Sequence, residues 1–275
     1  EQNRPYSYIH SWRNRAGLNT LPGSLNNIHR HYDLGNDFYR LWLDQDYMQY
    51  TCAYYPGEST TLEEAQVAKL DHVCRKLQLK PGQKVIEAGC GWGALALHMA
   101  EHYGARVHAY NVSKAQVEWA RRKAAERGLE DRVRFVMDDY RSIDERCDRF
   151  VSVGMLEHVG AANYRVLGDL VKQVLRPRGL ALLHTIGRSH PRVADAWIRR
   201  HIFPGGHVPS LSEMTAIFEP NRFTVLETIK LPDPISITVS FGSTPASTTR
   251  RAARPASHRK FCPRSRRAAA RSNWT

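Results

Sequence analysis

Apolar residues between positions 61 and 231 of this 275-residue chain recur with two different periods. Short aliphatic runs predict six strands, at Lys84–Glu87, Arg106–Tyr110, Arg132–Met137, Arg149–Val153, Leu180–Ile186 and Phe223–Thr228. Segments with helical spacing predict five helices, at Thr61–Leu79, Ala94–Tyr103, Ser113–Arg127, Asn163–Leu175 and from Leu211 onward. Thr61 and Glu64 are spaced as a capping box. This alternation predicts an α/β, Rossmann-like fold with a mostly parallel, doubly wound sheet.

The composition divides the chain into three parts. Residues 1–60 are interpreted as a helical N-terminal cap segment, with a short amphipathic helix at Asn36–Leu43. Residues 61–231 form the expected main domain, which includes an irregular lid insertion at about 187–210. In residues 232–275 Ser, Thr, Arg, Ala and Pro dominate. This composition predicts a basic low-complexity tail that is disordered from about residue 242.

The net charge of +13 comes mainly from that tail. Between Pro234 and Thr275 there are nine basic residues and no acidic one, which leaves 31 basic against 27 acidic residues in the rest. We therefore expect no nucleic-acid partner. The modest remaining excess suits a transient contact with a membrane surface.

Several classes of protein are disfavoured by what the chain lacks. No stretch approaches the ~18 consecutive apolar residues of a membrane-spanning helix, and Glu1 to Asn19 lack the apolar core of a secretory signal. The five cysteines are widely spaced, which favours a reducing compartment over a disulfide framework. His98 and His102 have no third ligand nearby, so we predict no metal site. The expected location is the cytoplasm, with the inner face of the membrane as a peripheral site.

A glycine-rich loop, Glu87 to Gly93, falls between a predicted strand and a predicted helix. Gly89, Gly91 and Gly93 allow a sharp turn and leave room for a ligand beside the backbone. The G-x-G-x-G spacing fits the dinucleotide pattern poorly, and the loop lacks the lysine of a P-loop. S-adenosylmethionine (SAM) has no phosphate and carries a positive sulfonium, beside which an acidic Glu87 is reasonable. The alternative is a tight turn without a ligand.

The next strand ends supply further candidate cofactor contacts. Asn111 and Gln116 replace the acidic residue that many nucleoside-binding proteins direct at the ribose. They would bond the ribose without charge, or merely begin a helix. After the third strand, Asp139 or its backbone could meet the adenine amino group, and Tyr140 could stack on the ring. The alternative is that both belong to a surface loop.

At this point the chain resembles the cyclopropane fatty acid synthase family, which includes the mycolic acid cyclopropane synthases. The motifs that carry the resemblance occur in order over about residues 25–230. They are His31 to Tyr39 (HYDLGNDFY), Tyr50 to Tyr55 (YTCAYY), Glu87 to Gly93, Gly154 to Gly160 (GMLEHVG), Leu183 to Ile186 (LHTI) and Ile202 to Gly206 (IFPGG). The resemblance implies a class I SAM-dependent methyltransferase fold, with Tyr50 and Thr51 beside the cofactor.

The family's chemistry adds the SAM methyl group to a cis double bond of an acyl chain, after which the carbocation loses a proton and closes a ring. The resemblance implies that a bound bicarbonate accepts this proton. Cys52, Glu157, His184 and the backbone of Ile186 would hold that ion. Glu157 would then donate as a neutral acid, or accept from the ion's hydroxyl group. Without the resemblance, Cys52 would be a small buried residue, Glu157 a residue that favours a helix N-terminus, and His184 a hydrogen-bonded core histidine.

The resemblance fails after residue 231. The family has a further tyrosine ligand there, but no tyrosine follows Tyr164 in this chain. Our hypothesis is that residues 232–275 are translated out of frame. If the tail is genuine, we expect the last strand of the sheet and one catalytic ligand to be missing.

Three other functions remain open. One is methyl transfer to the nitrogen of a small amine, as in related plant enzymes, and another leaves a methyl or methylene branch on the acyl chain. The third is an inactive protein that binds SAM or lipid, which the missing tyrosine favours. The expected substrate partner is an unsaturated phospholipid or acyl chain. The sequence leaves open whether the chain forms a homodimer.

Overall fold

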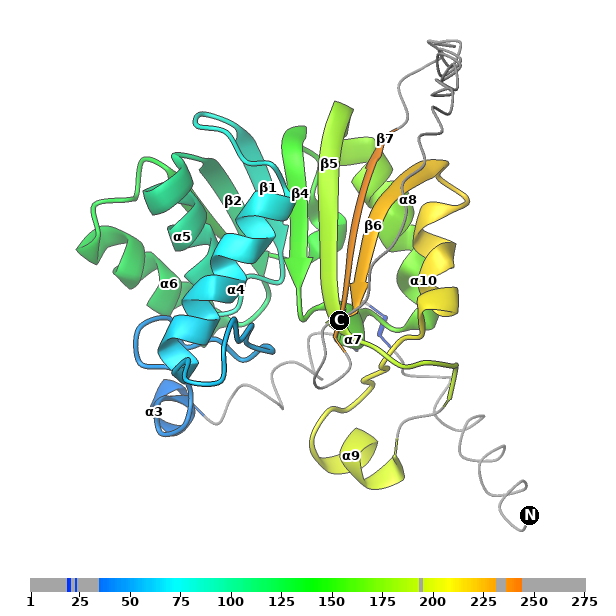
Figure 1. The fold of residues 1–275 in the computed structure, drawn as a ribbon, viewed down its shortest axis with the longest axis horizontal. Helices are drawn as coiled ribbons and strands as arrows, with labels where there is room; N and C mark the ends of the chain where they lie inside the picture. The colour runs from blue at the N-terminus through cyan, green and yellow to red at the C-terminus, as the bar shows by residue number, and fades with distance from the viewer. Residues whose placement is uncertain (1–18, 21–22, 24–34, 193–194, 231–235, 244–275) are drawn as a thin grey trace, which may run out of the picture. The chain divides into compact units, whose positions relative to one another are not determined.

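A seven-stranded sheet organises the part of the chain that the computed structural model describes, residues 19–20, 23, 35–192, 195–230 and 236–243. The strands are β1 Lys84–Ala88, β2 Arg106–Asn111, β3 Val133–Met137, β4 Cys147–Val153, β5 Leu175–Ile186, β6 Phe223–Lys230 and β7 Ser236–Ser243. Their order is β3-β2-β1-β4-β5-β7-β6 (Figure 1). Neighbours among β1 to β5 pair in parallel, whereas β7 runs antiparallel to β5 and β6. The predicted mostly parallel sheet is confirmed.

The described helices are α3 Asn36–Arg40, α4 Leu62–Lys76, α5 Ala94–Tyr103, α6 Lys114–Glu126, α7 Leu156–Val159, α8 Tyr164–Val174, α9 Ala196–His201 and α10 Leu211–Phe218. All five helices predicted for the main domain are confirmed. The capping box is confirmed too, because the Glu64 amide donates to the Thr61 hydroxyl at 3.3 Å and Glu64 accepts from the Thr61 amide at 2.9 Å. Within the described residues, no helix combines the length and apolarity that a bilayer crossing needs.

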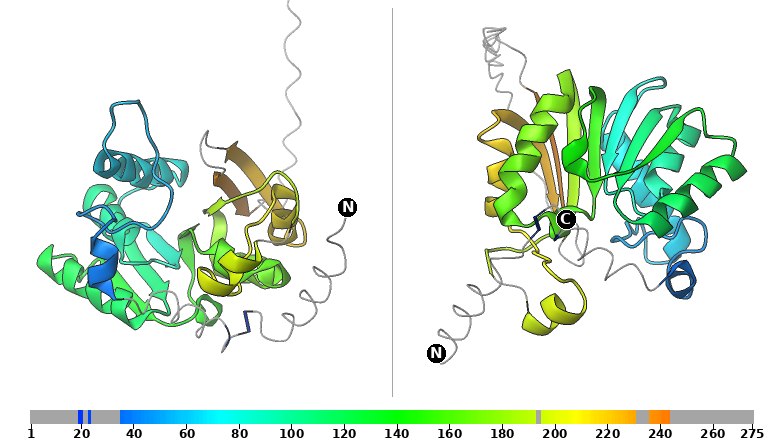
Figure 2. Two further views of the ribbon diagram at one scale, coloured as in Figure 1. Left: turned by 90° about the horizontal axis from the view of Figure 1, so that it is seen from below. Right: turned by 180° about the vertical axis from the view of Figure 1, so that it is seen from behind.

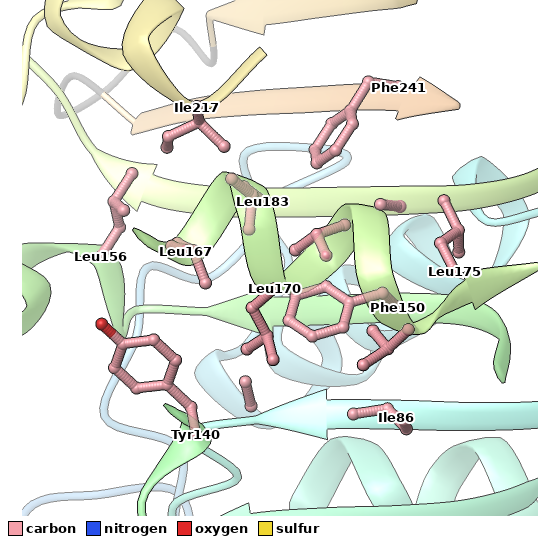
Figure 3. Close-up of a cluster of buried hydrophobic side chains, with 14 of the residues drawn as sticks. Ile86, Tyr140, Phe150, Leu156, Leu167, Leu170, Leu175, Leu183, Ile217 and Phe241 are labelled. Carbon is pink, nitrogen blue, oxygen red and sulfur yellow. The ribbon is translucent and has the colours of Figure 1, made fainter. Parts of the chain in front are cut away.

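Helices cover both faces of the sheet (Figures 1 and 2). On one face, α4, α5 and α6 pack against strand residues such as Val85 and Val151. On the other, α8 and α10 pack against Ile86 and Phe150 (Figure 3). Consecutive residues of one strand thus enter opposite cores, which is why these strands are continuous apolar runs in the sequence.

The expectation that the sheet lacks its last strand is wrong, because residues 236–243, beyond the expected boundary at 232, form β7. Ile237, Val239 and Phe241 are buried in the core, and the Phe241 ring lies 4.7 Å from that of Phe218 on α10. Their alternation with polar residues is a strand pattern. This strand pattern is short and adjoins a Ser- and Pro-rich stretch, so the average composition of residues 232–275 did not reveal it.

Two expectations for the ends of the chain fall mostly outside the described residues. The tail after residue 243 lies there, and so does most of the N-terminal cap segment before residue 35. Within the described residues 35–60, α3 is the one helix, and it is shorter than the predicted Asn36–Leu43.

Helix α8 approaches α10 closely at Gly168. A Cβ atom there would lie 2.3 Å from the carbonyl oxygen of Ile217. Alanine favours an isolated helix over glycine by ~1 kcal/mol, but overpacking costs about 1–3 kcal/mol. We predict that Gly168→Ala lowers the free energy of unfolding by about 1–2 kcal/mol. Urea denaturation measures this, with the exposed Gln173→Ala on α8 as a control that should change stability by less than ~0.5 kcal/mol. A Gly168→Ala protein as stable as the parent would contradict the prediction.

Candidate active site

The loop between β1 and α5 turns through three glycines with positive φ, 79° at Gly89, 54° at Gly91 and 88° at Gly93. A Cβ atom at Gly93 would lie 2.7 Å from the Phe135 ring, so this glycine permits close packing. A Cβ atom at Gly91 would meet nothing within 4 Å. The loop backbone is therefore accessible to a ligand at Gly91, whereas side chains pack against it at Gly93.

A cavity adjoins this loop, with about 830 Å³ of empty space when its opening to solvent is included. We call it the first cavity. Seven of the ten predicted cofactor residues line it, namely Tyr50, Thr51, Glu87, Gly89, Gly91, Asn111 and Gln116. Gly93 does not. The carboxyl ends of β1 and β2 thus meet at one cavity, as the parallel sheet predicts.

Asn111 and Gln116 reach the first cavity as a bonded pair. The Asn111 side-chain amide donates to Oε1 of Gln116 at 2.8 Å and to the carbonyl oxygen of Gly91 at 3.1 Å. Ser113 caps α6 by accepting from the Gln116 amide. The pair therefore joins the glycine loop to the start of α6 and presents uncharged polar groups to a ligand.

Asp139 and Tyr140 line a smaller side cavity that shares Asn111 and His158 with other parts of the site. The Asp139 carboxylate accepts from Nε of Arg141 at 2.7 Å and from Nη2 at 3.0 Å. The carboxylate predicted to meet adenine is therefore engaged by Arg141 in this structure. The buried Tyr140 hydroxyl has no hydrogen-bond partner among the described residues.

Glu87 brings a buried carboxyl group to the first cavity. It is 3% exposed, and its Oε2 has no hydrogen-bond partner in the described part of the chain. Burial raises the pKa of Glu87 to about 8, although Lys69 and the Ala96 amide oppose this shift. A buried acid without a partner is costly, so this position suits a cationic ligand.

A second cavity, with about 790 Å³ of empty space, brings together the four predicted catalytic residues Cys52, Glu157, His184 and Ile186. They come from three segments, since Cys52 lies in a loop, Glu157 on α7, and His184 and Ile186 at the end of β5. The two cavities share a wall of four residues, Tyr50, Thr51, Gly154 and His158. The candidate site is therefore two adjoining chambers.

Glu157 is held by its neighbours across the second cavity. The Ile186 amide donates to Oε1 of Glu157 at 2.7 Å, so Ile186 acts on this carboxyl group directly. Oε2 is inaccessible and has no hydrogen-bond partner among the described residues. Burial raises the pKa of Glu157, and burial also raises the pKa of the Cys52 thiol. Both groups therefore favour their neutral forms.

His184 is oriented by β7. Its Nδ1 lies 2.8 Å from Oγ1 of Thr238, the residue opposite it in the β5–β7 register. Burial lowers the pKa of His184 to about 3, and the nearby Lys69 and His72 act in the same direction. The imidazole is therefore neutral.

The lid insertion closes one side of the second cavity with Ile198, Phe203, Gly206, His207 and Val208. Its two ends are joined to each other by an isolated parallel bridge between Arg188 and Ser210. The His207 amide also donates to the Glu157 carbonyl oxygen at 2.8 Å. The lid thus depends on the same short helix that carries the central carboxyl group.

An aromatic cluster places Tyr50 over the shared wall. The Tyr39 ring on α3 lies 5.0 Å from that of Trp92 in the glycine loop and 5.8 Å from that of Tyr50. Phe203 of the lid stacks at 6.5 Å from Tyr50 on its other side. Nε1 of Trp92 donates to Oδ1 of Asn36 at 2.8 Å, which anchors α3 on the loop.

Sequence reasoning missed several residues of the site, among them Lys69 and Thr238. Lys69 lies on the apolar face of α4, and a lysine within such a face was a usable signal for a buried charge. Thr238 belongs to the strand that composition had hidden. Neither residue falls within a recognisable motif.

Comparison with known proteins places the chain in a family. Residues 21–240 match the mycolic acid cyclopropane synthetases. The chain belongs to this family. It is 44% identical to the cyclopropane-fatty-acyl-phospholipid synthase of Escherichia coli (strain K12) over 192 residues, or 70% of this chain and 49% of that protein. It therefore spans about half the length of this relative.

Solved structures agree with this assignment. Mycolic acid cyclopropane synthase CmaA1, complexed with SAH and CTAB, is 35% identical with a TM-score of 0.70, covering 74% of this chain and 76% of that one. Coclaurine N-methyltransferase, bound to N-methylheliamine and SAH, is 27% identical with a TM-score of 0.66, covering 84% and 69%. The predicted class I SAM-dependent methyltransferase fold is confirmed.

The burial of His184 predicts how the stability of the protein changes with pH. In the unfolded chain a histidine binds a proton below its ordinary pKa of ~6.5, whereas the buried ring does so only below about 3. Between these values the unfolded state binds more protons, so stability falls as the pH falls. We predict that the parent loses stability relative to His184→Gln by about 1.4 kcal/mol per pH unit over this window. Urea denaturation from pH 7 to pH 4 measures the difference, and a constant difference would refute the burial effect.

Proposed function

We propose that this chain is a SAM-dependent transferase that adds a one-carbon unit to the cis double bond of an unsaturated acyl chain. The observation that carries the proposal is the wall that the two cavities share, with Thr51 and His158 on it. A cofactor in the first cavity and an acyl chain in the second would meet at this wall. Reacting atoms must approach to ~3–3.5 Å, and the shared wall allows it.

The residues of the first cavity suit SAM. Glu87 places a carboxyl group beside a positive ligand, Gly91 offers open backbone, and Asn111 with Gln116 offers neutral polar groups for the ribose. When bound, SAM supplies an electrophilic methyl group. The related structure of CmaA1 with SAH and CTAB supports the assignment.

The second cavity suits an acyl chain. Ile198, Phe203 and Val208 give it apolar walls from the lid, and Ile186 adds another from β5. Apolar walls with a few convergent polar groups are typical of a site for an apolar ligand. The cyclopropane-fatty-acyl-phospholipid synthase of E. coli supports an unsaturated phospholipid as the substrate.

The proton that leaves when the ring closes needs an acceptor. His184, with a pKa of about 3, is a weak base, and the Cys52 thiol stays protonated because burial raises its pKa. The family resemblance implies a bicarbonate ion as the acceptor, and we propose that Cys52, Glu157 and His184 hold it. Neutral donors in a dry pocket suit a small anion. The Ile186 amide contributes by orienting Glu157, to which it donates.

The proposal also includes a transient contact with a membrane surface from the cytoplasm. Trp197 on α9 is 61% exposed, and its neighbour Ile198 lines the second cavity. An exposed aromatic side chain beside an acyl site suits insertion at a lipid interface. The four described cysteines are unpaired, which agrees with a reducing compartment.

One observation favours a second candidate function, methyl transfer to a small amine. Coclaurine N-methyltransferase matches 84% of this chain, and Glu157 offers a buried carboxyl group that could face a cationic amine. The apolar lid wall argues for the acyl chain instead. Lipid and amine products therefore have to be measured together.

We predict that the purified chain, given methyl-labelled SAM and vesicles of an unsaturated phospholipid, adds one CH₂ to the acyl chains. Glu157→Gln should lower the rate by about 100-fold or more, because it alters the group that faces the developing charge. Mass spectrometry of the released acyl chains measures the product. Saturated vesicles and the exposed Glu118→Gln on α6 serve as controls.

Two results would overturn this function. Methylation of a benzylisoquinoline amine with unchanged lipid would establish the second candidate. SAM binding without transfer to either substrate would indicate an inactive SAM-binding protein.

The membrane contact has its own test. Trp197→Ser should lower the affinity for phospholipid vesicles, measured by co-sedimentation, by about three- to tenfold. The reason is that it removes an exposed apolar ring that membrane insertion would bury. Leu226→Ser replaces an exposed apolar residue of β6 outside the lid and should leave sedimentation unchanged. Equal binding by the parent and Trp197→Ser would remove α9 from the contact.

A further inference from the structure

Lys69 is a buried cation that the proposed reaction has not used. It lies on α4, is 3% exposed and lines the first cavity. Its Nζ has one hydrogen-bond partner among the described residues, Oγ1 of Thr51 at 2.5 Å, and no ion-pair partner there. An ammonium group has three donors. Two of them therefore remain for a ligand.

Among the described residues, no acid forms an ion pair with Lys69. The Asp44 carboxylate instead accepts from the backbone amides of Tyr47 at 2.8 Å and Gln49 at 2.6 Å. Glu87 faces the same cavity, but forms no ion pair with Lys69. Burial lowers the pKa of Lys69 to about 7, although Asp44, Cys52 and Glu87 oppose the shift. Lysine is rarely buried unless it is paired, so a partner is expected from outside the chain.

The first cavity therefore holds two complementary groups with unused hydrogen-bonding capacity, the remaining donors of Lys69 and Oε2 of Glu87. Lys69 would attract a carboxylate, and Glu87 would attract a cation. A ligand with an α-amino-acid end carries both charges within a few ångströms. The adenosine part of SAM offers neither a carboxylate nor an ammonium group, so these two residues select its amino-acid end.

We propose that Lys69, together with the Thr51 hydroxyl to which it donates, binds the α-carboxylate of the SAM amino-acid moiety, with Glu87 facing the positive part. The inference rests on the proposed use of SAM. Lys69 lines the first cavity but not the second, whereas Thr51 lines both. This placement assigns Lys69 to the cofactor and leaves the acceptor of the proton to Cys52, Glu157 and His184.

Isothermal titration calorimetry at pH 7 tests this assignment with two ligands that differ in one group. SAM carries the α-carboxylate, and decarboxylated SAM lacks it but keeps the sulfonium. Lys69→Met should weaken SAM binding by about 10- to 100-fold, because it removes a charge-assisted hydrogen bond. It should change the affinity for decarboxylated SAM by less than about threefold. Lys69→Arg keeps the charge and should restore part of the affinity for SAM.

The controls separate this proposal from a folding defect and from the proposed function. Thermal unfolding of each variant shows whether the fold survives, and Thr51→Val should give a smaller loss that is also confined to SAM. If the parent binds SAM and Lys69→Met weakens both ligands equally, the carboxylate assignment fails and the proposed function stands. If the parent does not bind SAM, both fail.

Discussion

Burial of ionisable groups without matched counter-charges is the constraint on which this site depends. Glu87 and Glu157 have raised pKa values, and those of Lys69 and His184 are lowered, each chiefly by burial. Every shift favours a neutral group. Removing these groups from water costs free energy, and a charged ligand that binds beside them can offset part of this cost. The two cavities thus differ from ordinary core, where charged groups are paired or excluded.

The architecture keeps these groups dry by joining segments that are far apart in the sequence. Trp92 of the glycine loop packs on α3, Tyr50 packs between α3 and Phe203 of the lid, and the lid bonds back to Glu157 through the His207 amide. The shared wall is therefore held from three directions. Loss of one contact would loosen both cavities, because Tyr50 lines both.

Much of this could be predicted from the sequence, because local patterns decide it. Short aliphatic runs and helical spacing located the strands and helices of the main domain, and the parallel sheet then brought Glu87, Asn111 and Gln116 to one edge. The meeting of Cys52, Glu157 and His184 followed from family motifs. Side-chain partners were not predictable: Asp139 resembles a ligand-binding acid but holds Arg141, and no local signal reveals such pairing. The burial of Lys69 had a local signal, its place on the apolar face of α4, but its contact with Thr51 depends on the tertiary fold.

The hidden strand has a consequence beyond the core. The β5–β7 register sets His184 opposite Thr238 and Ile186 opposite Ser236, so the strand that completes the sheet also holds the end of β5 on which the second cavity is built. A Cβ atom at Gly187 would lie 2.1 Å from Cδ1 of Ile237, so the chain enters the lid pressed against β7. If residues 232–243 were exchanged for another sequence, the imidazole would lose the Thr238 hydroxyl that orients its ring, and the lid would lose its support. The stability of this part of the sheet and the chemistry of the second cavity therefore both depend on β7, whatever follows it in the chain.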